Sequence, residues 1–167
     1  MATSTEQPWG TRLRPYQQGD EEKVLALWQR SLPTDPVTRD VFTARILLDV
    51  NFDTEGFIVA EAGEEVVGFI YAAVRSTPLY GDDFEPEVGW VSVFFVHPTW
   101  RRQGIGTALV QAALAYVRAR GRAALAIAPY VPTYFWPGPD VERHAGAVAL
   151  LVDSGTIGQL SCERMTE

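Results

Sequence analysis

The sequence predicts one α/β domain in which strands and helices alternate along the chain. The chain has 167 residues, the length of one ordinary domain, and 47% of them are apolar. Strand-like runs at 57–61, 66–74 and 88–96 alternate with stretches whose apolar residues recur at helical spacing. No internal repeat, low-complexity tract or linker divides the chain, which favours one domain over two.

The N-terminal third is expected to hold a strand and two helices. Residues 1–10 are polar and are expected to be flexible, so the domain is assigned to residues 11–167. A short edge strand is predicted at 12–14, Asp20 is a typical N-cap for the first helix, and a second helix is predicted over 38–49. The apolar faces consist of Val24, Leu27, Trp28 and Leu32 in the first helix and Phe42, Ile46 and Leu47 in the second.

The middle of the chain predicts a hairpin, a strand, a helix and a further strand. A short glycine-containing link between two β-prone runs is typical of a hairpin, and a continuous apolar run indicates a strand buried on both faces. In order, the ranges are the hairpin strands 57–61 and 66–74, an acidic loop at 76–87, the strand 88–96, an amphipathic helix from Ile105 to about Gly121, and a strand at 123–128.

Charge and composition exclude several classes of function. Fourteen basic against 21 acidic residues give a net charge of −7, which argues against a nucleic-acid partner or a polybasic membrane contact. Cys162 is the only cysteine, and His97 and His144 are the only histidines, so we expect no internal disulfide and no metal site. No signal peptide or membrane-spanning run is visible, and a soluble, cytoplasmic protein is expected.

The segment that joins strand 88–96 to the next helix carries the chemistry. There a buried strand ends, a short turn follows, and Gly104 and Gly106 open a helix. The first N–H groups of a helix have no partner within it, and the helix dipole adds partial positive charge. Glycines let an anion approach the backbone, and Arg101 and Arg102 add charge at the rim. The pattern therefore predicts a phosphate-binding turn.

Two common phosphate-binding motifs do not fit this turn. A P-loop needs a lysine, and Lys23 is the only lysine of the chain. A dinucleotide-binding turn needs a third glycine where Leu109 stands. The run Arg-Arg-Gln-Gly-Ile-Gly at 101–106, after Phe-Phe-Val-His-Pro at 94–98, instead resembles the Arg/Gln-x-x-Gly-x-Gly/Ala signature of the GNAT acetyltransferase superfamily. The resemblance extends from about residue 13 to about residue 155.

This resemblance implies a fold and an acetyl-CoA site. The fold is a mixed, mainly antiparallel sheet flanked by helices and splayed where acetyl-CoA binds. The backbone amides of 102–107 are implied to hold the pyrophosphate, and the main chain of 94–96 to pair with the pantetheine arm. An amide near Phe95 or Val96 would polarise the thioester carbonyl. The implied cofactor-binding residues are Phe94, Phe95, Val96, Arg101, Arg102, Gln103, Gly104, Ile105, Gly106 and Thr107.

The resemblance also implies an N-acetyltransferase that moves an acetyl group from acetyl-CoA to a primary amine, by direct attack in a ternary complex. The amine must first lose a proton, usually to a carboxylate or to a water beside one. Glu87 is the candidate base because it lies closest to where family members often place one, and a solvated loop charge is the alternative. Leu151 stands where the family often has a tyrosine acid, and Tyr130 and Tyr134 could replace it by chemistry only.

The acceptor is expected to be a small-molecule amine or a peptide amine. Asp82 belongs to the acidic loop, which would attract a cationic amine. Tyr134 and Trp136 lie in an aromatic segment that either lines an acceptor pocket or packs as a lid over the core. The segment resembles one in some bacterial GNAT proteins, including proteins with two such domains. A catalytically weak or inactive CoA-binding or interaction module remains the alternative function.

The C-terminal tail departs from the family pattern. Residues 156–167 can scarcely supply the two strands with which the family normally ends, so these strands are expected to be incomplete or completed by a partner chain. An exposed sheet edge invites pairing, which favours a homodimer.

Overall fold

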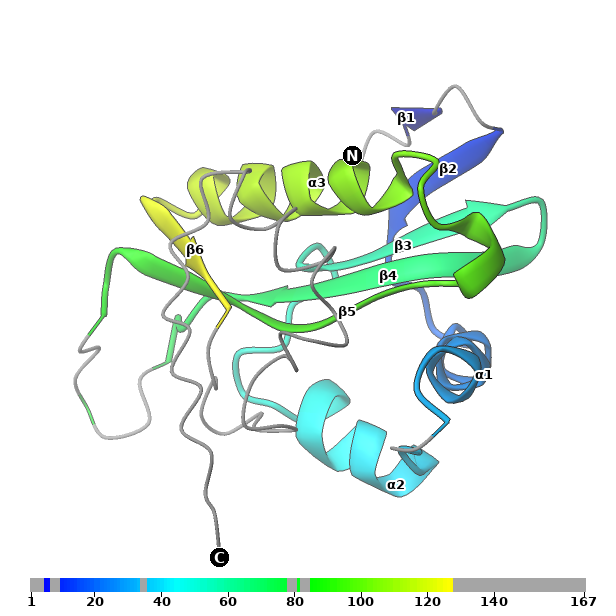
Figure 1. The fold of residues 1–167 in the computed structure, drawn as a ribbon. Coiled ribbons are helices and arrows are strands. Elements are labelled where there is room, and N and C mark those ends of the chain that lie inside the picture. Colours follow the sequence, from blue (N-terminus) through cyan, green and yellow to red (C-terminus); the bar gives the residue numbers. More distant parts are fainter. Residues whose placement is uncertain (1–4, 7–9, 34–35, 78–80, 82–84, 128–167) are drawn as a thin grey trace, which may run out of the picture.

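A curved sheet with helices on both faces makes up the protein (Figure 1). The computed structural model describes residues 5–6, 10–33, 36–77, 81 and 85–127. The described strands are β1 (Thr5–Glu6), β2 (Thr11–Pro15), β3 (Phe57–Ala62), β4 (Glu65–Ala73), β5 (Val88–Val96) and β6 (Ala124–Ala126). The described helices are α1 (Glu21–Ser31), α2 (Arg39–Phe42) and α3 (Ile105–Ala119), with a π-helix η1 (Thr43–Leu47) and a 3₁₀-helix η2 (Pro98–Trp100).

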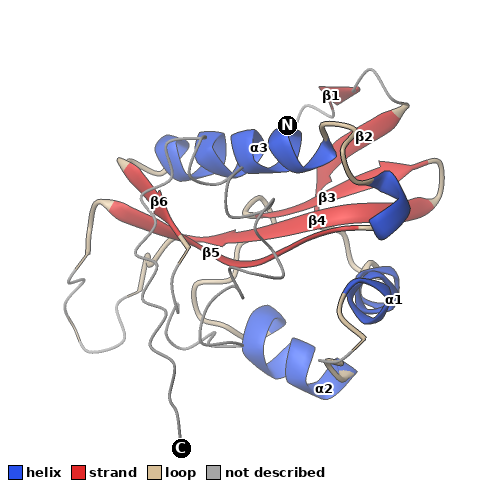
Figure 2. Ribbon diagram, viewed as in Figure 1, coloured by secondary structure: helices blue, strands red, loops and turns tan. Residues whose placement is uncertain are grey.

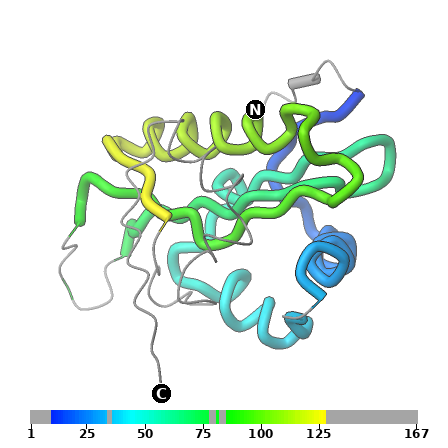
Figure 3. Tube along the Cα trace, viewed as in Figure 1, coloured from blue at the N-terminus to red at the C-terminus, as the bar shows by residue number. Residues whose placement is uncertain are grey.

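The strands follow one another in the sheet in the order of the sequence, from β1 to β6. Neighbours from β1 to β5 are antiparallel, whereas β6 lies parallel to β5. The parallel pair needs a crossover, and α3 supplies it by running back over the sheet, as Figure 3 traces. The expected mixed, mainly antiparallel sheet is confirmed. The expected edge position of β2 is wrong, because β1 pairs with it, Thr5 opposite Leu13.

The helices divide between the two faces of the sheet. Figure 2 shows α3 along one face, and α1 and α2 against the other. Each face has its own apolar cluster, because side chains of successive strand residues point to opposite sides. The α3 cluster includes Ile58, Ile70, Val91, Leu109 and Val117, and the α1 cluster includes Leu27, Trp28, Phe57, Phe69 and Val93. The sequence prediction that 88–96 is buried on both faces is therefore explained by helices on both sides.

Helix α1 begins at a buried charge cluster. Asp20 occupies the N-cap position, but its side chain makes no cap hydrogen bond, contrary to the expectation from the sequence. Its carboxylate instead accepts hydrogen bonds from Arg14 Nη1 at 2.6 Å, Arg14 Nη2 at 2.8 Å and the N–H of Gln17 at 2.8 Å. Arg14 also pairs with Glu61 of β3, so one guanidinium connects β2, β3 and the start of α1.

The second helical segment is less regular than its sequence pattern predicts. Four residues of α2 continue directly into η1, so residues 39–47 combine an α-turn with a π-turn. Phe42 and Ile46 are fully buried, as predicted, while Leu48 and Val50 beyond them are exposed. Phe42 and Ile46 are four positions apart and therefore lie on the same side of this helical segment.

Two glycines let α3 lie close against the sheet. A Cβ atom on Gly68 of β4 would lie 3.1 Å from Leu109 and 3.4 Å from Ile105, both in the first half of α3. A Cβ atom on Gly89 of β5 would lie 2.6 Å from Val117, near the other end of the helix. Only glycine permits both approaches without displacement. The start of α3 is thereby held over the end of β5.

The C-terminal end of α3 is held by polar contacts. Tyr116 donates a hydrogen bond to Asp53 Oδ2 at 3.3 Å, and Arg120 forms ion pairs with Asp53 and Glu55. The Arg120 guanidinium also lies over the Tyr116 ring at 3.9 Å. Burial, aided by the charge of Asp53, raises the pKa of Tyr116 above its ordinary value, so this phenol stays protonated.

Candidate active site

The turn between β5 and α3 is built from residues that cap one another. His97 Nδ1 contacts Thr99 Oγ1 at 2.9 Å, and the N–H of Trp100 donates to the His97 carbonyl at 2.9 Å, which closes η2. Gln103 Nε2 donates to the Thr99 carbonyl at 3.2 Å. Arg101 Nε donates to the Val96 carbonyl at 3.1 Å and so ties the turn back to the end of β5. The turn is thus held by its own side chains.

The start of α3 presents backbone N–H groups in a concave arrangement. Arg102 has φ +63° and Gly104, the N-cap of α3, has φ +84°, and such left-handed residues turn successive N–H groups toward one side. The first hydrogen bond of the helix runs from Ala108 N–H to the Gly104 carbonyl at 3.0 Å. Among the described residues, none accepts a hydrogen bond from the N–H groups of 105–107. We name the N–H groups of residues 102–107 the α3 cradle.

The α3 cradle fits an anion such as a diphosphate. Unpaired N–H groups at a helix N-terminus carry partial positive charge and point outward. Arg101 and Arg102 are exposed beside them and add two positive charges, while Gly104 and Gly106 leave the backbone uncovered. In the chain as a whole acidic residues outnumber basic ones, so this concentration of positive charge is local.

Beside the cradle, one edge of β5 is open. On one side, β5 pairs with β4 along its length, from Trp90 opposite Ala73 to Val96 opposite Gly68. On the other side, β6 pairs only with residues 88–90. Within the described part of the chain, no strand pairs with the residues 91–96 on that side. Figure 1 shows β6 meeting β5 only near the end at which β5 begins.

This open edge can accept an extended ligand as if it were another strand. Unpaired main-chain N–H and C=O groups of a sheet edge bind extended chains by the same hydrogen bonds as a neighbouring strand. On the α1 side of the sheet, the Phe95 ring packs against Trp28 and Phe69, whose ring centroids lie 4.9 and 5.3 Å from its own. The three predicted pantetheine-binding residues lie immediately before the cradle, but they do not face the same way. The His97 N–H donates to the Val67 carbonyl of β4, and hydrogen-bonded positions alternate along an antiparallel pair, so the main-chain groups of Phe95 also face β4, whereas those of Phe94 and Val96 face the open edge.

The pairing of β5 with β4 contains a bulge that the sequence pattern does not predict. Val93 lies opposite Tyr71 and Val91 lies opposite Ala72, so Ser92 is an extra residue in β5. The bulge shifts the alternation of side chains, so Val91 and Phe94 pack on the α3 side and Val93 and Phe95 on the α1 side. Ser92 Oγ is buried and has no hydrogen-bond partner among the described residues.

The predicted base lies at the opposite end of β5 from the cradle. Glu87 directly precedes the strand and is exposed, and its main-chain carbonyl accepts hydrogen bonds from Ala123 at 2.8 Å and Ala124 at 2.9 Å. Phe95 lies eight positions further along the chain, a distance of about 26 Å along an extended strand. The other predicted acceptor-side residues, Asp82, Tyr134 and Trp136, and the tyrosine substitute Tyr130 and Leu151 lie outside the described residues.

Two anchors of the acidic loop were missed by sequence reasoning. Asn51, almost fully buried, accepts hydrogen bonds from the N–H groups of Ser76 at 2.9 Å and Thr77 at 2.7 Å and donates to the Thr77 carbonyl at 3.0 Å. Arg122 donates to the carbonyls of Arg75 and Pro86, the two ends of the same loop. Neither residue lies in a motif, so only the fold could bring them to the loop.

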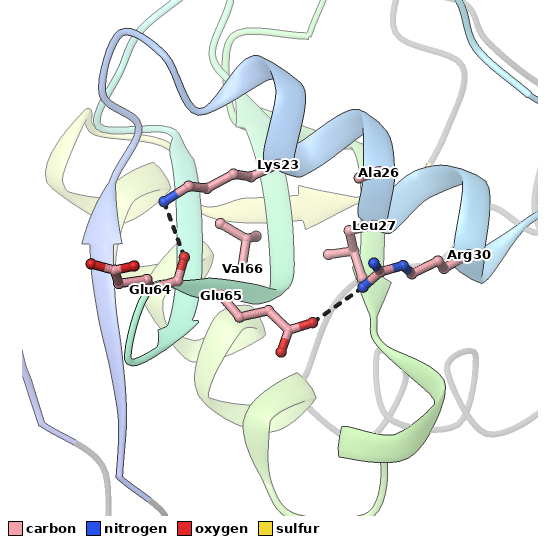
Figure 4. A pocket seen from close by; sticks show the side chains of 7 residues that line it. All are labelled: Lys23, Ala26, Leu27, Arg30, Glu64, Glu65 and Val66. Carbon is pink, nitrogen blue, oxygen red and sulfur yellow. Dashed lines mark hydrogen bonds and ion pairs between the residues drawn. The ribbon is translucent and has the colours of Figure 1, made fainter.

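A separate hollow lies on the face opposite α3, between α1 and the turn of the β3–β4 hairpin. It encloses about 350 Å³ and is lined by Lys23, Ala26, Leu27, Arg30, Glu64, Glu65 and Val66. Figure 4 shows Lys23 and Arg30 reaching across it, and their contacts with the Glu64 carbonyl (3.0 Å) and Glu65 (3.2 Å) join the helix to the hairpin. These residues are not part of the α3 cradle or of the open edge of β5.

The described ranges contain no group of three or more histidine, cysteine, aspartate or glutamate side chains that could hold a metal ion. None of the helices in the same ranges is long and apolar enough to cross a membrane.

Comparison with known sequences gives a consistent picture. A model of the acetyltransferase (GNAT) family matches residues 21–132. The mycothiol acetyltransferase of Thermobispora bispora is 36% identical over 121 residues, which are 70% of this chain and 40% of that protein. The aminoglycoside N(6')-acetyltransferase type 1 of Stenotrophomonas maltophilia is 34% identical over 95 residues, 56% of this chain and 57% of that protein. The chain thus spans less than half of the mycothiol enzyme.

Solved structures share the fold. The glucosamine N-acetyltransferase region of a fungal multi-domain β-N-acetylglucosaminidase superposes with a TM-score of 0.70 over 93% of this chain and 17% of that one, at 21% identity. The ribosomal-protein-S18-alanine N-acetyltransferase of Escherichia coli gives a TM-score of 0.60 over 87% of this chain and 76% of that one, at 18% identity. With the family match covering more than half of its residues, the chain belongs to the acetyltransferase (GNAT) family.

Proposed function

We propose that this chain transfers an acetyl group from acetyl-CoA to a primary amine, by direct attack in a ternary complex. One observation carries the proposal. The unpaired N–H groups of the α3 cradle lie directly beyond the open edge of β5, so a diphosphate site adjoins a site for an extended arm. A ligand that joins a diphosphate to an amide-containing arm matches this arrangement, and CoA has that construction. The family membership supports the same assignment.

The chemistry assigned to this chain's residues has three parts. Arg102 to Thr107 would bind the diphosphate through main-chain N–H groups, and residues 94–96 would hold the pantetheine arm by strand-like hydrogen bonds. Of the two amides expected near the thioester, at Phe95 and Val96, the Val96 N–H faces the open edge and would stabilise the negative charge that develops on the thioester oxygen. The amine nitrogen then forms a bond to the acetyl carbon as the carbon–sulfur bond breaks, and the departing thiolate takes a proton from water.

We assign the acceptor to the class of amines that carry positive charge before reaction. The net charge of −7 favours the approach of cations, and the acidic loop at 76–87 contains no basic residue. Relatives named for aminoglycoside and mycothiol acetylation support a small amine-bearing acceptor. Glu87 is proposed as the carboxylate that finally receives the amine's proton, and Asp82, Tyr134 and Trp136 as acceptor-side residues.

The CoA site is tested by placing a negative charge in the cradle. Gly104→Glu and Gly106→Glu should each weaken CoA binding at least about tenfold, because a carboxylate would lie against the diphosphate. Isothermal titration calorimetry measures the effect. Gly121→Glu is the matched control for Gly104→Glu: Gly121 has φ +76°, close to the +84° of Gly104, and open space around it, so it carries the same backbone strain and charge change at the other end of α3.

The results separate the proposal from its alternatives. CoA affinity that stays unchanged in both cradle variants would refute the site. CoA binding without turnover of any amine in a panel of small amines, amino acids and peptides would favour an inactive CoA-binding module instead. Competition by ATP as strong as that by CoA would show a general nucleotide site and would remove the basis for acetyl transfer.

A further inference from the structure

One side chain holds the two ends of the acidic loop at 76–87 together. Arg122 Nη2 donates to the Arg75 carbonyl at 2.6 Å, and Arg122 Nη1 donates to the Pro86 carbonyl. Arg75 follows β4 and Pro86 precedes β5, so the guanidinium joins the places where the chain leaves one strand and approaches the next. A guanidinium keeps its donors in a fixed planar fork, which sets the separation of the two carbonyls.

The main chain around Arg122 is itself fixed. Gly121, just after the end of α3, has φ +76°, and the Arg122 N–H donates back to the Val117 carbonyl at 3.2 Å, as in a Schellman motif. The next two residues donate their N–H groups to the Glu87 carbonyl at 2.8 and 2.9 Å. Residues 122–124 therefore hold the end of the loop against the start of β5, where Figure 1 shows β6 arriving from α3.

A buried amide fixes the other end of the loop. Asn51 is 6% exposed, and its Oδ1 accepts hydrogen bonds from Ser76 N–H at 2.9 Å and Thr77 N–H at 2.7 Å, while its Nδ2 donates to the Thr77 carbonyl at 3.0 Å. The Asn51 N–H in turn donates to Asp49 Oδ1 at 3.0 Å. A buried polar group with this many partners holds its neighbours in one arrangement. The loop is thus anchored from two elements that are distant in the sequence.

We propose that Arg122 is a positioning residue for the amine acceptor, because it fixes the base of the loop whose negative charge attracts that amine. The inference rests on the proposed acetyl transfer, which places the acidic loop on the acceptor side. Fixing the ends of a loop before binding lowers the entropy that binding must remove. The α3 cradle lies at the opposite end of the 15 residues of α3, about 22 Å away. Arg122 should therefore affect the amine and not acetyl-CoA.

The test replaces Arg122 by alanine and measures steady-state kinetics with an amine that the wild-type chain acetylates. The KM for the amine should rise about tenfold, and the KM for acetyl-CoA should stay within about twofold of the wild-type value. The change in charge acts in the opposite direction. It takes the net charge from −7 to −8, which by itself favours a cationic amine. A higher KM for the amine would therefore report the loss of the loop anchor.

Arg118→Ala is the matched control. Arg118 lies in α3 and is exposed, and no hydrogen bond joins it to the described ends of the loop. This variant has the same net charge as Arg122→Ala and should leave both KM values unchanged. Arg122→Lys keeps the charge but has one nitrogen where arginine uses two, so its KM for the amine should lie between those of the wild type and Arg122→Ala. If Arg122→Ala does not fold, Arg122→Lys decides the test by the same comparison of the two KM values.

The second anchor tests whether the effect passes through the loop. Asn51→Ala leaves the N–H groups of Ser76 and Thr77 without their partner, and it should also raise the KM for the amine and not that for acetyl-CoA. Arg122 and Asn51 belong to different parts of the fold and share only the loop. If Arg122→Ala raised the KM for the amine and a folded Asn51→Ala did not, the loop would not be the route, and the inference would be overturned.

The outcomes separate this inference from the function on which it rests. If the wild-type chain acetylates an amine and Arg122→Ala has an unchanged KM for it, the role of Arg122 alone is overturned. An equal rise in both KM values would overturn it too, because it would show a general loosening of the fold. A wild-type chain that binds CoA but acetylates no amine would overturn the proposed transfer, and the inference with it.

Discussion

Arg14 lies at the centre of a charge cluster that is almost closed to solvent. Its side chain is 7% exposed and pairs with Asp20 and Glu61, while Arg12 adds a second hydrogen bond to Glu61 at 2.7 Å. Burial by itself would raise the pKa of Asp20, but the hydrogen bonds from Arg14 and from the Gln17 N–H outweigh it and hold that pKa below its ordinary value. Removing one member of such a cluster leaves a buried charge less compensated.

At the residue scale, we therefore expect Asp20→Asn to lower the free energy of unfolding by about 3 kcal/mol at pH 7. A carboxyl whose pKa is depressed by folding stabilises the protein above its unfolded pKa, near 4, and this contribution disappears as the pH falls through the folded pKa. The difference between wild type and variant should thus be constant above about pH 5 and shrink below about pH 4. Urea unfolding followed across this range measures it.

The control is an exposed ion pair on the same protein. Arg30 and Glu65 pair at 3.2 Å with side chains 60% and 52% exposed. Glu65→Gln should change the free energy of unfolding by less than about 1 kcal/mol, because solvent screens the pair and its side chains lose entropy on pairing. If Asp20→Asn were as mild as Glu65→Gln at neutral pH, the cluster at Arg14 would not hold the start of α1.

At the scale of elements, the position of α3 decides whether the cradle meets the open edge of β5. Its approach to the sheet depends on Gly68 near its start and Gly89 near its end. The two sites differ in how they could accommodate a side chain. At Gly68 an added Cβ atom would be 3.1 Å from the end of a leucine side chain and 3.2 Å from the Phe95 carbonyl, whereas at Gly89 the closest atoms all belong to Val117.

We expect Gly89→Ala to destabilise the protein by about 1–3 kcal/mol, because its Cβ would lie 2.6 Å from Val117 Cγ2 and 2.8 Å from Cγ1. Val117→Ala removes both methyl groups. The double variant should therefore be more stable than the sum of the single changes implies, by about 1 kcal/mol. Thermal or urea unfolding of the four proteins of this double-mutant cycle gives the coupling energy. Strictly additive effects would show that Val117 does not set the helix-to-sheet distance.

At the scale of the whole molecule, the homodimer expected from the sequence stays a prediction. It depends on a sheet edge near the C-terminus, and residues 128–167 lie outside those that the structure describes. An unpaired edge favours association with a second copy. Mass measurement at dilute concentration should then give twice the 18.5 kDa of one chain. A single species at 18.5 kDa would contradict the prediction, and a dimer that dissociates on addition of CoA would place the contact at the β5 edge.

The sequence by itself determined the elements whose pattern is local. The strand 88–96 and the helix start at Ile105 were predicted with the bounds observed, because an apolar run and a glycine-marked helix start are properties of neighbouring residues. The hairpin of β3 and β4 followed from its short glycine-containing link, and the turn that we propose to bind phosphate was located from Gly104 and Gly106. In each case the physical cause acts within a few residues along the chain.

Only the tertiary structure decided features that depend on residues distant in the sequence. Aspartate is a residue type typical of a helix N-cap, but the Asp20 carboxylate binds Arg14, which the fold brings beside it. Ser92 looks like an ordinary strand residue, and it is the register with Tyr71 and Ala72 that makes it the bulge. The open edge of β5 likewise arises because, among the described residues, β6 pairs with only three residues of β5. Strand register and charge pairing are set by packing across the sheet, so the pattern of neighbouring residues in the sequence does not predict them.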